Sequence, residues 1–161
     1  MQSVAGTVSK EVTITAPIDL VWHAWTIADR VKEWFAPQVI VEPKESGAFE
    51  LYFIPGDRER MNTKGCTIVQ LRKEEQLSFT WKGPDQFTEL MNAEENLTVV
   101  NVTFTRIDET TTKVRIDHSG FLEGNQWSEA IAWHDMAWRG VLESLKSALE
   151  KGEGNLCCQP V

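Results

Sequence analysis

The feature that most constrains the fold of this chain is one long helical pattern that follows a run of strand patterns. The helical stretch extends from Gln126 to Gly152 without a proline, and Gly152 is typical of a helix end. At about 1.5 Å per residue such a helix spans the full width of a small domain. Its apolar residues recur every three to four positions, as on one helical face: Ala130, Trp133, Ala137, Val141, Leu145 and Ala148, widened by Trp138, Leu142 and Leu149.

Strand patterns fill most of the chain before this helix. Residues 8–15 alternate as a first strand, and further segments are rich in β-branched and aromatic residues: 39–43, 47–54, 64–74, 76–83, 96–108 and 110–121. Turn formers separate these segments at hairpin distances, which favours an antiparallel meander. Two short helical patterns, 16–26 and 29–35, come between the first strand and the others, and Pro37 ends the second.

This order predicts an α+β fold: a curved antiparallel sheet of about six to seven strands, two short helices, and the long C-terminal helix packed across the sheet. One helix is about 10 Å across, too narrow to fill the concave face of such a sheet. Large side chains must fill the remaining space or leave a cavity. The polar segment 53–65 is either a loop at the mouth of that cavity or an ordinary hairpin connection. We expect a single domain over residues 1–152 and a flexible tail over residues 153–161.

A net charge of -8 limits the partners of this chain. Binding to nucleic-acid phosphates needs clustered Lys and Arg, and the pair Arg72-Lys73 is followed at once by two glutamates, so we expect no nucleic-acid partner. An anionic membrane surface is disfavoured for the same reason, and no apolar stretch is long enough to span a membrane. The first residues lack a signal-peptide pattern, so the sequence predicts a cytoplasmic protein without membrane insertion.

Large aromatic residues are frequent in segments predicted to face the space between helix and sheet. Such rings line small-molecule pockets well, because they supply rigid apolar area and, in tryptophan, one directed N–H donor. Plain core packing is the alternative for any one of them. We expect a ligand-binding wall formed by Trp25, Trp34, Phe53, Phe79, Trp81, Val102, Phe104, Ile116, Trp133, Ala137 and Val141, with His118 as polar anchor.

No constellation in the sequence requires catalysis. His118 shares strand parity with Val114 and Ile116, so it points inward and could orient a ligand, act as a general base, or be a hydrogen-bonded core histidine. His134, beside Asp135, is interpreted as a surface pair or a rim group. Histidine and cysteine spacings fit no metal site and no phosphate-binding loop occurs, so we expect neither a metal nor a cofactor.

Several short motifs follow one another in a fixed order along the chain. They are Ala16-Pro17, Val21-Trp22, Trp34-Phe35 ahead of Pro37, FTW at 79–81, HSGF at 118–121 and AWRGVLESLKSALEKG at 137–152. In this order they resemble the START-like (SRPBCC) superfamily, in the subgroup named after the activator of Hsp90 ATPase. The resemblance extends from about residue 10 to residue 152. It implies the helix-grip fold, in which the long helix lies across the curved sheet over a hydrophobic cavity.

The superfamily contains lipid carriers, polyketide cyclases, hydrolases, toxin-sequestering proteins and a co-chaperone domain, so the fold leaves the function open. Our leading hypothesis is a binding protein that holds a small hydrophobic or aromatic ligand between the long helix and the sheet. One alternative is an interaction domain for an Hsp90-type chaperone, which needs no open cavity. A lesser alternative is an enzyme of the cyclase or hydrolase type, with His118 as base. Such a protein would be a monomer or a homodimer.

Overall fold

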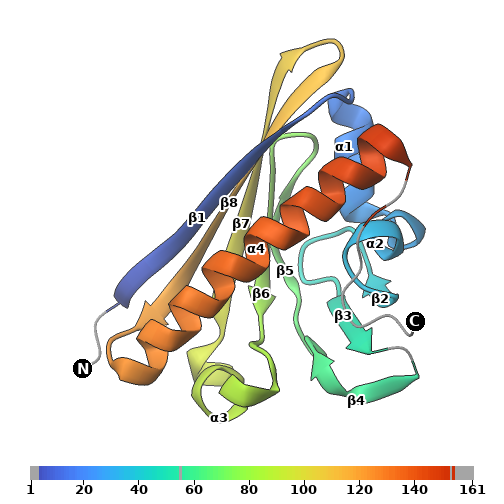
Figure 1. The fold of residues 1–161 in the computed structure, drawn as a ribbon. Helices are drawn as coiled ribbons and strands as arrows, with labels where there is room; N and C mark the ends of the chain where they lie inside the picture. The colour runs from blue at the N-terminus through green and yellow to red at the C-terminus, as the bar shows by residue number, and fades with distance from the viewer. Residues whose placement is uncertain (1–3, 55, 153, 155–161) are drawn as a thin grey trace.

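The computed structural model of the protein describes residues 4–54, 56–152 and 154 (Figure 1). The strands are β1 (Val4–Ile14), β2 (Gln38–Val41), β3 (Phe49–Ile54), β4 (Asp57–Asn62), β5 (Ile68–Arg72), β6 (Gln76–Trp81), β7 (Thr98–Asp108) and β8 (Thr111–Leu122). The α-helices are α1 (Ile18–Thr26), α2 (Ala28–Trp34), α3 (Thr88–Met91) and α4 (Asn125–Lys151). Two 3₁₀ turns, η1 (Asp85–Phe87) and η2 (Glu94–Asn96), flank α3.

The strands pair antiparallel in two sheets. One sheet has five strands in the order β1-β8-β7-β6-β5, and the other has three strands in the order β2-β3-β4. A bridge between Ala48 and Thr67 joins the two sheets, and the Phe49 N–H donates to the Cys66 carbonyl beside it. Because β1 pairs with β8, the strand at the start of the chain lies beside the strand that precedes α4.

Helix α4 crosses one face of the sheet diagonally, with α1 and α2 beside its C-terminal part (Figure 1). The hairpin of β3 and β4, which we call the β3–β4 arm (residues 49–62), lies on the same side of the molecule as α2 (Figure 1). The expected α+β architecture, with a long C-terminal helix across an antiparallel sheet, is confirmed. No helix in the described part of the chain is both long and apolar enough to cross a membrane.

Strand β4 lies inside the segment whose polar sequence allowed either a loop or a hairpin connection. Its six residues, DRERMN, show no apolar alternation, and pairing defines the strand: Tyr52 lies opposite Asn62, and Ile54 lies opposite Asp57. Strand alternation arises when one face is buried, and most of β4 is only partly covered. The segment is therefore a hairpin with a strand of its own.

The buried face of α4 is rotated by about one residue from the predicted stripe. Trp127, Ala130, His134, Trp138, Leu142, Ser144 and Leu145 are buried, whereas Trp133, Ala137 and Val141 remain half-buried. The interpretation of His134 as part of a surface pair is wrong, because only 1% of the residue is exposed. Polarity alone suggested an exposed position, but both ring nitrogens have hydrogen-bond partners inside the protein.

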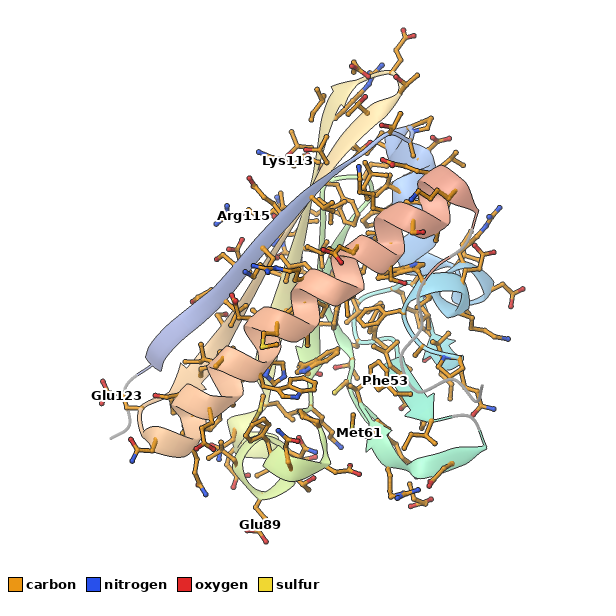
Figure 2. The ribbon with its side chains drawn as sticks, viewed as in Figure 1. Phe53, Met61, Glu89, Lys113, Arg115 and Glu123 are labelled. Carbon is orange, nitrogen blue, oxygen red and sulfur yellow. The ribbon has the colours of Figure 1, made fainter. Side chains whose placement is uncertain are left out.

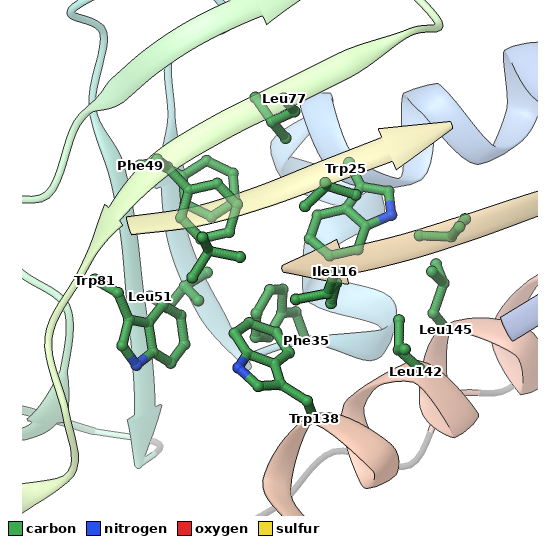
Figure 3. Close-up of a cluster of buried hydrophobic side chains, with 14 of the residues drawn as sticks. Trp25, Phe35, Phe49, Leu51, Leu77, Trp81, Ile116, Trp138, Leu142 and Leu145 are labelled. Atoms are coloured by element: carbon green, nitrogen blue, oxygen red, sulfur yellow. The ribbon is translucent and has the colours of Figure 1, made fainter. Parts of the chain in front are cut away.

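The aromatic core is centred on Trp25, which is fully buried between α1, α2 and the sheet (Figure 3). Its ring lies 4.6 Å from that of Trp34 and 6.3 Å from that of Phe104, centroid to centroid, in edge-to-face geometry. Phe49 and Phe79 stack at 4.0 Å in the same layer. The Trp25 indole N–H has no hydrogen-bond acceptor among the described residues, so this ring contributes packing rather than a polar contact.

Candidate functional site

A cavity of about 360 Å³ opens between α4, the β3–β4 arm and the end of β6. This volume falls within the range typical of small-molecule sites, about 300–1,000 Å³. In Figure 2, Phe53 and Met61 lie between the arm and α4, where they form one side of the cavity. The lining residues are Trp34, Phe35, Phe53, Met61, Asn62, Trp81, Lys82, Gly83, Pro84, Trp133, His134, Ala137, Trp138, Gly140, Val141 and Glu143.

The structure divides the sequence-predicted wall residues into two sets. The residues that line the cavity are Trp34, Phe53, Trp81, Trp133, Ala137 and Val141. The residues that do not reach it are Trp25, Phe79, Val102, Phe104, Ile116 and His118, all of which are buried in the packed core. Strand parity correctly points the five strand residues of the second set inward, whereas Trp25 lies on α1. Parity says nothing about position along α4, and α1 and α2 fill the space at their end of the sheet.

Several lining residues were not among those predicted from the sequence. Phe35 follows α2, and Gly83 and Pro84 belong to the turn after β6, where no periodic pattern exists. Trp138 was visible in the helical stripe, so its position offered a usable signal. Gly140 was also visible as a glycine inside a long helix, which is an unfavourable position that calls for a reason.

Two tryptophans of the cavity wall donate hydrogen bonds to the two buried histidines, His118 and His134. The Trp138 Nε1–H donates to His118 Nδ1 at 3.0 Å, and the Trp81 Nε1–H donates to His134 Nε2 at 3.1 Å. The rings of His118 and His134 lie edge to face at 5.0 Å. Each histidine thus fixes the orientation of one indole, His118 from within the packed core and His134 from a position that itself lines the cavity.

These contacts determine the tautomer of each imidazole, because an indole N–H can only donate. His118 accepts at Nδ1, so its proton is on Nε2, which lies 2.7 Å from Thr98 Oγ1. His134 accepts at Nε2, so its Nδ1–H donates to the Ala130 carbonyl at 2.7 Å. Burial lowers the pKa of His134 to about 4, and burial together with the neighbouring His134 lowers the pKa of His118 well below its usual value. Both imidazoles are therefore neutral near pH 7.

Three of the four lining tryptophans donate the indole N–H to an acceptor within the protein, and the wall of the cavity is mainly apolar. The third of these bonds is from Trp34 Nε1–H to the Ala24 carbonyl, at 2.8 Å. The polar residues that line the cavity are Asn62, Lys82, His134 and Glu143. The arrangement suits an apolar body with a small number of polar contacts.

The geometry of His118 bears on the possibility of general-base chemistry. A base must reach a substrate proton through its free lone pair. The Nδ1 lone pair of His118 accepts the Trp138 N–H, and the ring is fully buried outside the set of residues that line the cavity. Burial likewise raises the pKa of the Cys66 thiol above its usual value, which keeps it protonated. Within the described ranges, no three His, Cys, Asp or Glu side chains are grouped to hold a metal ion.

An antiparallel sheet crossed by one long helix, with an apolar cavity between them, defines the helix-grip class of proteins. The sequence profile described as Activator of Hsp90 ATPase homolog 1-like protein matches residues 15–150, and the chain belongs to that family. No curated protein matches the sequence.

Solved structures with a similar fold include protein MLL2253 from Mesorhizobium loti, at 23% identity and a TM-score of 0.72, covering 92% of this chain and 99% of that one. The Aha1 dimer from Colwellia psychrerythraea has 20% identity and a TM-score of 0.72, covering 93% of this chain and 100% of that one. DynU16, from the dynemicin biosynthetic locus, has 22% identity and a TM-score of 0.73, and the match covers 96% of this chain but 51% of that one. At these identities the likeness shows the fold alone.

Proposed function

We propose that this protein binds a small apolar or aromatic molecule in the cavity between α4 and the β3–β4 arm. The observation that carries the proposal is the fixed aromatic wall, in which Trp34, Trp81 and Trp138 each donate the indole N–H to an acceptor within the protein. A wall held this way keeps its shape without a ligand, so little ordering is required when a ligand binds. The residues proposed to contact the ligand are Trp34, Phe53, Trp81, Trp133, Ala137 and Val141.

Native mass spectrometry of the freshly purified protein, compared with its denatured mass, tests for a bound molecule directly. A panel of aromatic compounds, followed by tryptophan fluorescence and thermal unfolding, tests binding when the protein is purified empty. Binding to the folded state alone raises the unfolding temperature with ligand concentration. The proposal is contradicted if the native mass equals that of the polypeptide alone and no compound raises the unfolding temperature.

The variant Ala137→Trp places a large ring in the cavity from α4, whereas Ala132→Trp places the same ring on an exposed face of the same helix. We expect Ala137→Trp to weaken binding of any aromatic ligand at least tenfold, because the added ring occupies the same space. Ala132→Trp should bind as the unmodified protein does. Thermal unfolding of both variants confirms that they fold, and equal affinities in the two would place the ligand elsewhere.

A second candidate function is an interaction with an Hsp90-type chaperone, which the family description favours. This function would use an outer surface, so it predicts stimulation of a chaperone ATPase that the Ala137→Trp change leaves intact. Measured side by side, ligand binding and ATPase stimulation separate the two functions. A protein that binds aromatic compounds and leaves the ATPase rate unchanged supports the first function only.

A further inference from the structure

Met61, which lines the cavity from β4, has an unusual backbone conformation. Its φ is 49°, in the left-handed region that residues other than glycine rarely adopt. The other described non-glycine residues with a positive φ, Ser46 and Glu74, lie in connections between strands, where turns call for such conformations. Met61 instead lies within a strand and lines the cavity, so a contact from elsewhere in the protein is needed to hold it there.

The left-handed residue changes which side chains of β4 can face the cavity. In a regular strand, consecutive side chains point to opposite faces, so two neighbours do not face the same space. Met61 and its neighbour Asn62 nevertheless both line the cavity. Figure 2 shows the Met61 side chain between the arm and α4. The positive φ interrupts the alternation of the strand and is therefore part of how the arm forms the cavity wall.

A side chain from another segment holds the Met61 backbone. The Met61 N–H donates to Asp85 Oδ1 at 2.9 Å, across 24 positions of the chain. A hydrogen bond to a carboxylate is stronger than one between neutral groups. Asp85 is exposed, and it is not among the described residues that line the cavity. Its influence on the cavity therefore passes through the Met61 backbone.

The segment that carries Asp85 is itself fixed to the body of the protein. Asp85 is the first residue of η1, whose Phe87 is buried and lies edge to face with Trp133 of α4, at 6.5 Å between ring centroids. The Thr88 hydroxyl donates to the Asp85 carbonyl at 2.8 Å. The Asp85 carboxylate is thus presented from a fixed point, and Met61 on the arm is the group that it positions.

We infer that Asp85 is a positioning residue of the proposed ligand site: by accepting the Met61 N–H, it holds the methionine side chain against the ligand. This inference rests on the proposed binding function and identifies a residue outside the cavity that sets the affinity for the ligand. A thioether sulfur makes favourable contacts with aromatic rings, and the unbranched methionine side chain adapts to irregular shapes. Without the hydrogen bond, Met61 should relax to an ordinary strand conformation, in which it no longer shares a face with Asn62.

The test measures the affinity for N-phenyl-1-naphthylamine, an uncharged aromatic probe whose fluorescence rises in apolar surroundings. Asp85→Ala should bind the probe about fivefold more weakly than the unmodified protein, which corresponds to roughly one sulfur–aromatic contact. Asp85→Asn keeps an oxygen acceptor and should bind as the unmodified protein does. Glu89, an exposed residue that projects from α3 away from the body of the protein (Figure 2), is the control for the loss of a negative charge on the same segment. Glu89→Ala should also bind as the unmodified protein does.

A second pair of variants separates positioning from a general effect on the fold. Met61→Gly has no side chain to present, and glycine adopts a positive φ without strain. If Asp85 acts through Met61, then Met61→Gly and the double variant Met61→Gly/Asp85→Ala should bind the probe with the same affinity. Because Asp85 is exposed, its replacement should leave the protein folded, and thermal unfolding of every variant without the probe checks this.

Other results contradict the inference in distinct ways. Equal affinities in the unmodified protein and Asp85→Ala mean that the contribution of Met61 does not depend on the hydrogen bond. A loss in Asp85→Asn or Glu89→Ala as large as that in Asp85→Ala means that the charge of the segment matters and the acceptor does not. A further loss when Asp85→Ala is added to Met61→Gly means that Asp85 acts by another route. If neither the probe nor any other neutral aromatic compound binds the unmodified protein, the binding function itself is contradicted, and this inference with it.

Discussion

The two buried histidines are neutral acceptors for the indoles of the cavity wall, and this is their structural role at the scale of single residues. Protonation of His134 would place an N–H opposite the Trp81 N–H, and protonation of His118 would do the same opposite Trp138. Either event removes a hydrogen bond and leaves a buried charge. The geometry and the lowered pKa values therefore point to the same sensitivity to acid.

Stability should fall as the pH drops below the ordinary histidine pKa. Both pKa values are lower in the folded protein, so the unfolded chain binds more protons from about pH 6.5 down to the folded values, about 4 for His134. The contribution of the neutral histidines to the unfolding free energy is fully present above this pH range. As the pH falls through the range, the contribution decreases by up to about 1.4 kcal/mol per pH unit for each histidine. Urea unfolding at pH 7.5, 6.0 and 5.0 measures the slope.

Two variants test which residue causes this dependence of the unfolding free energy on pH. His134→Gln should reduce the dependence of the unfolding free energy on pH by the contribution of one histidine, because glutamine does not titrate. His23→Gln, which replaces an exposed histidine on α1 by the same residue, is the control for the substitution itself. Identical slopes in all three proteins would show that the acid sensitivity arises from other groups.

Helix α4 shows what sequence patterns can and cannot predict at the scale of an element. Its length and its end at Gly152 follow from the absence of breakers and the left-handed C-cap, with a φ of 81°. The rotation of the helix about its own axis does not follow from the pattern, because Trp133, Ala137 and Val141 are apolar residues that line a cavity rather than pack in the core. A periodic pattern gives the same signal for both kinds of burial.

Close packing does not explain why residue 140 of α4 is a glycine. Nothing lies within 4 Å of a Cβ built there, and the residue lines the cavity. We expect Gly140→Ala to raise the unfolding free energy by about 0.5–1 kcal/mol, since glycine lowers helix stability by that amount. Chemical denaturation measures the change. Gly124→Ala, at the N-cap of the same helix, is the control, and it should destabilise because its φ is 130°.

A loss of stability in Gly140→Ala, comparable with that in Gly124→Ala, would contradict this explanation. It would mean that the helix needs the freedom of glycine at its centre. A raised unfolding free energy together with unchanged ligand affinity would show that the open space beside Gly140 is wide enough for an added methyl group.

The whole molecule is built from two sheets that are joined at Ala48 and Thr67, and the cavity lies where the arm of the smaller sheet faces α4. The overall architecture could be predicted from the sequence, because segregated strands and helices allow few arrangements. The cavity wall could be predicted only in part. Residues such as Phe35, Lys82 and Pro84 reach it from helix ends and turns, and their place depends on tertiary contacts that no local pattern encodes.

A ligand that touches both sides of the cavity should stiffen the molecule unevenly. We expect a saturating aromatic ligand to slow amide hydrogen exchange in β4 and in the part of α4 from Trp133 to Glu143, which line the cavity. The pairing of β1 with β8 lies away from the site and should change only by the global stabilisation. Hydrogen exchange followed by mass spectrometry distinguishes the two, and uniform protection of all elements would argue against a ligand in this cavity.

The pairing of β1 with β8 has a consequence for the order of events during synthesis. Ser9 and Asp117, which are hydrogen-bonded across these strands, lie 108 positions apart in the chain. A growing chain therefore carries β1 without its partner until β8 has left the ribosome, and α4, which covers β1, follows later still. Contacts between such distant positions close large loops and slow folding. Strand β1 is made before the other described strands and is among the last of them to be paired, so its unpaired backbone groups are exposed to aggregation until then.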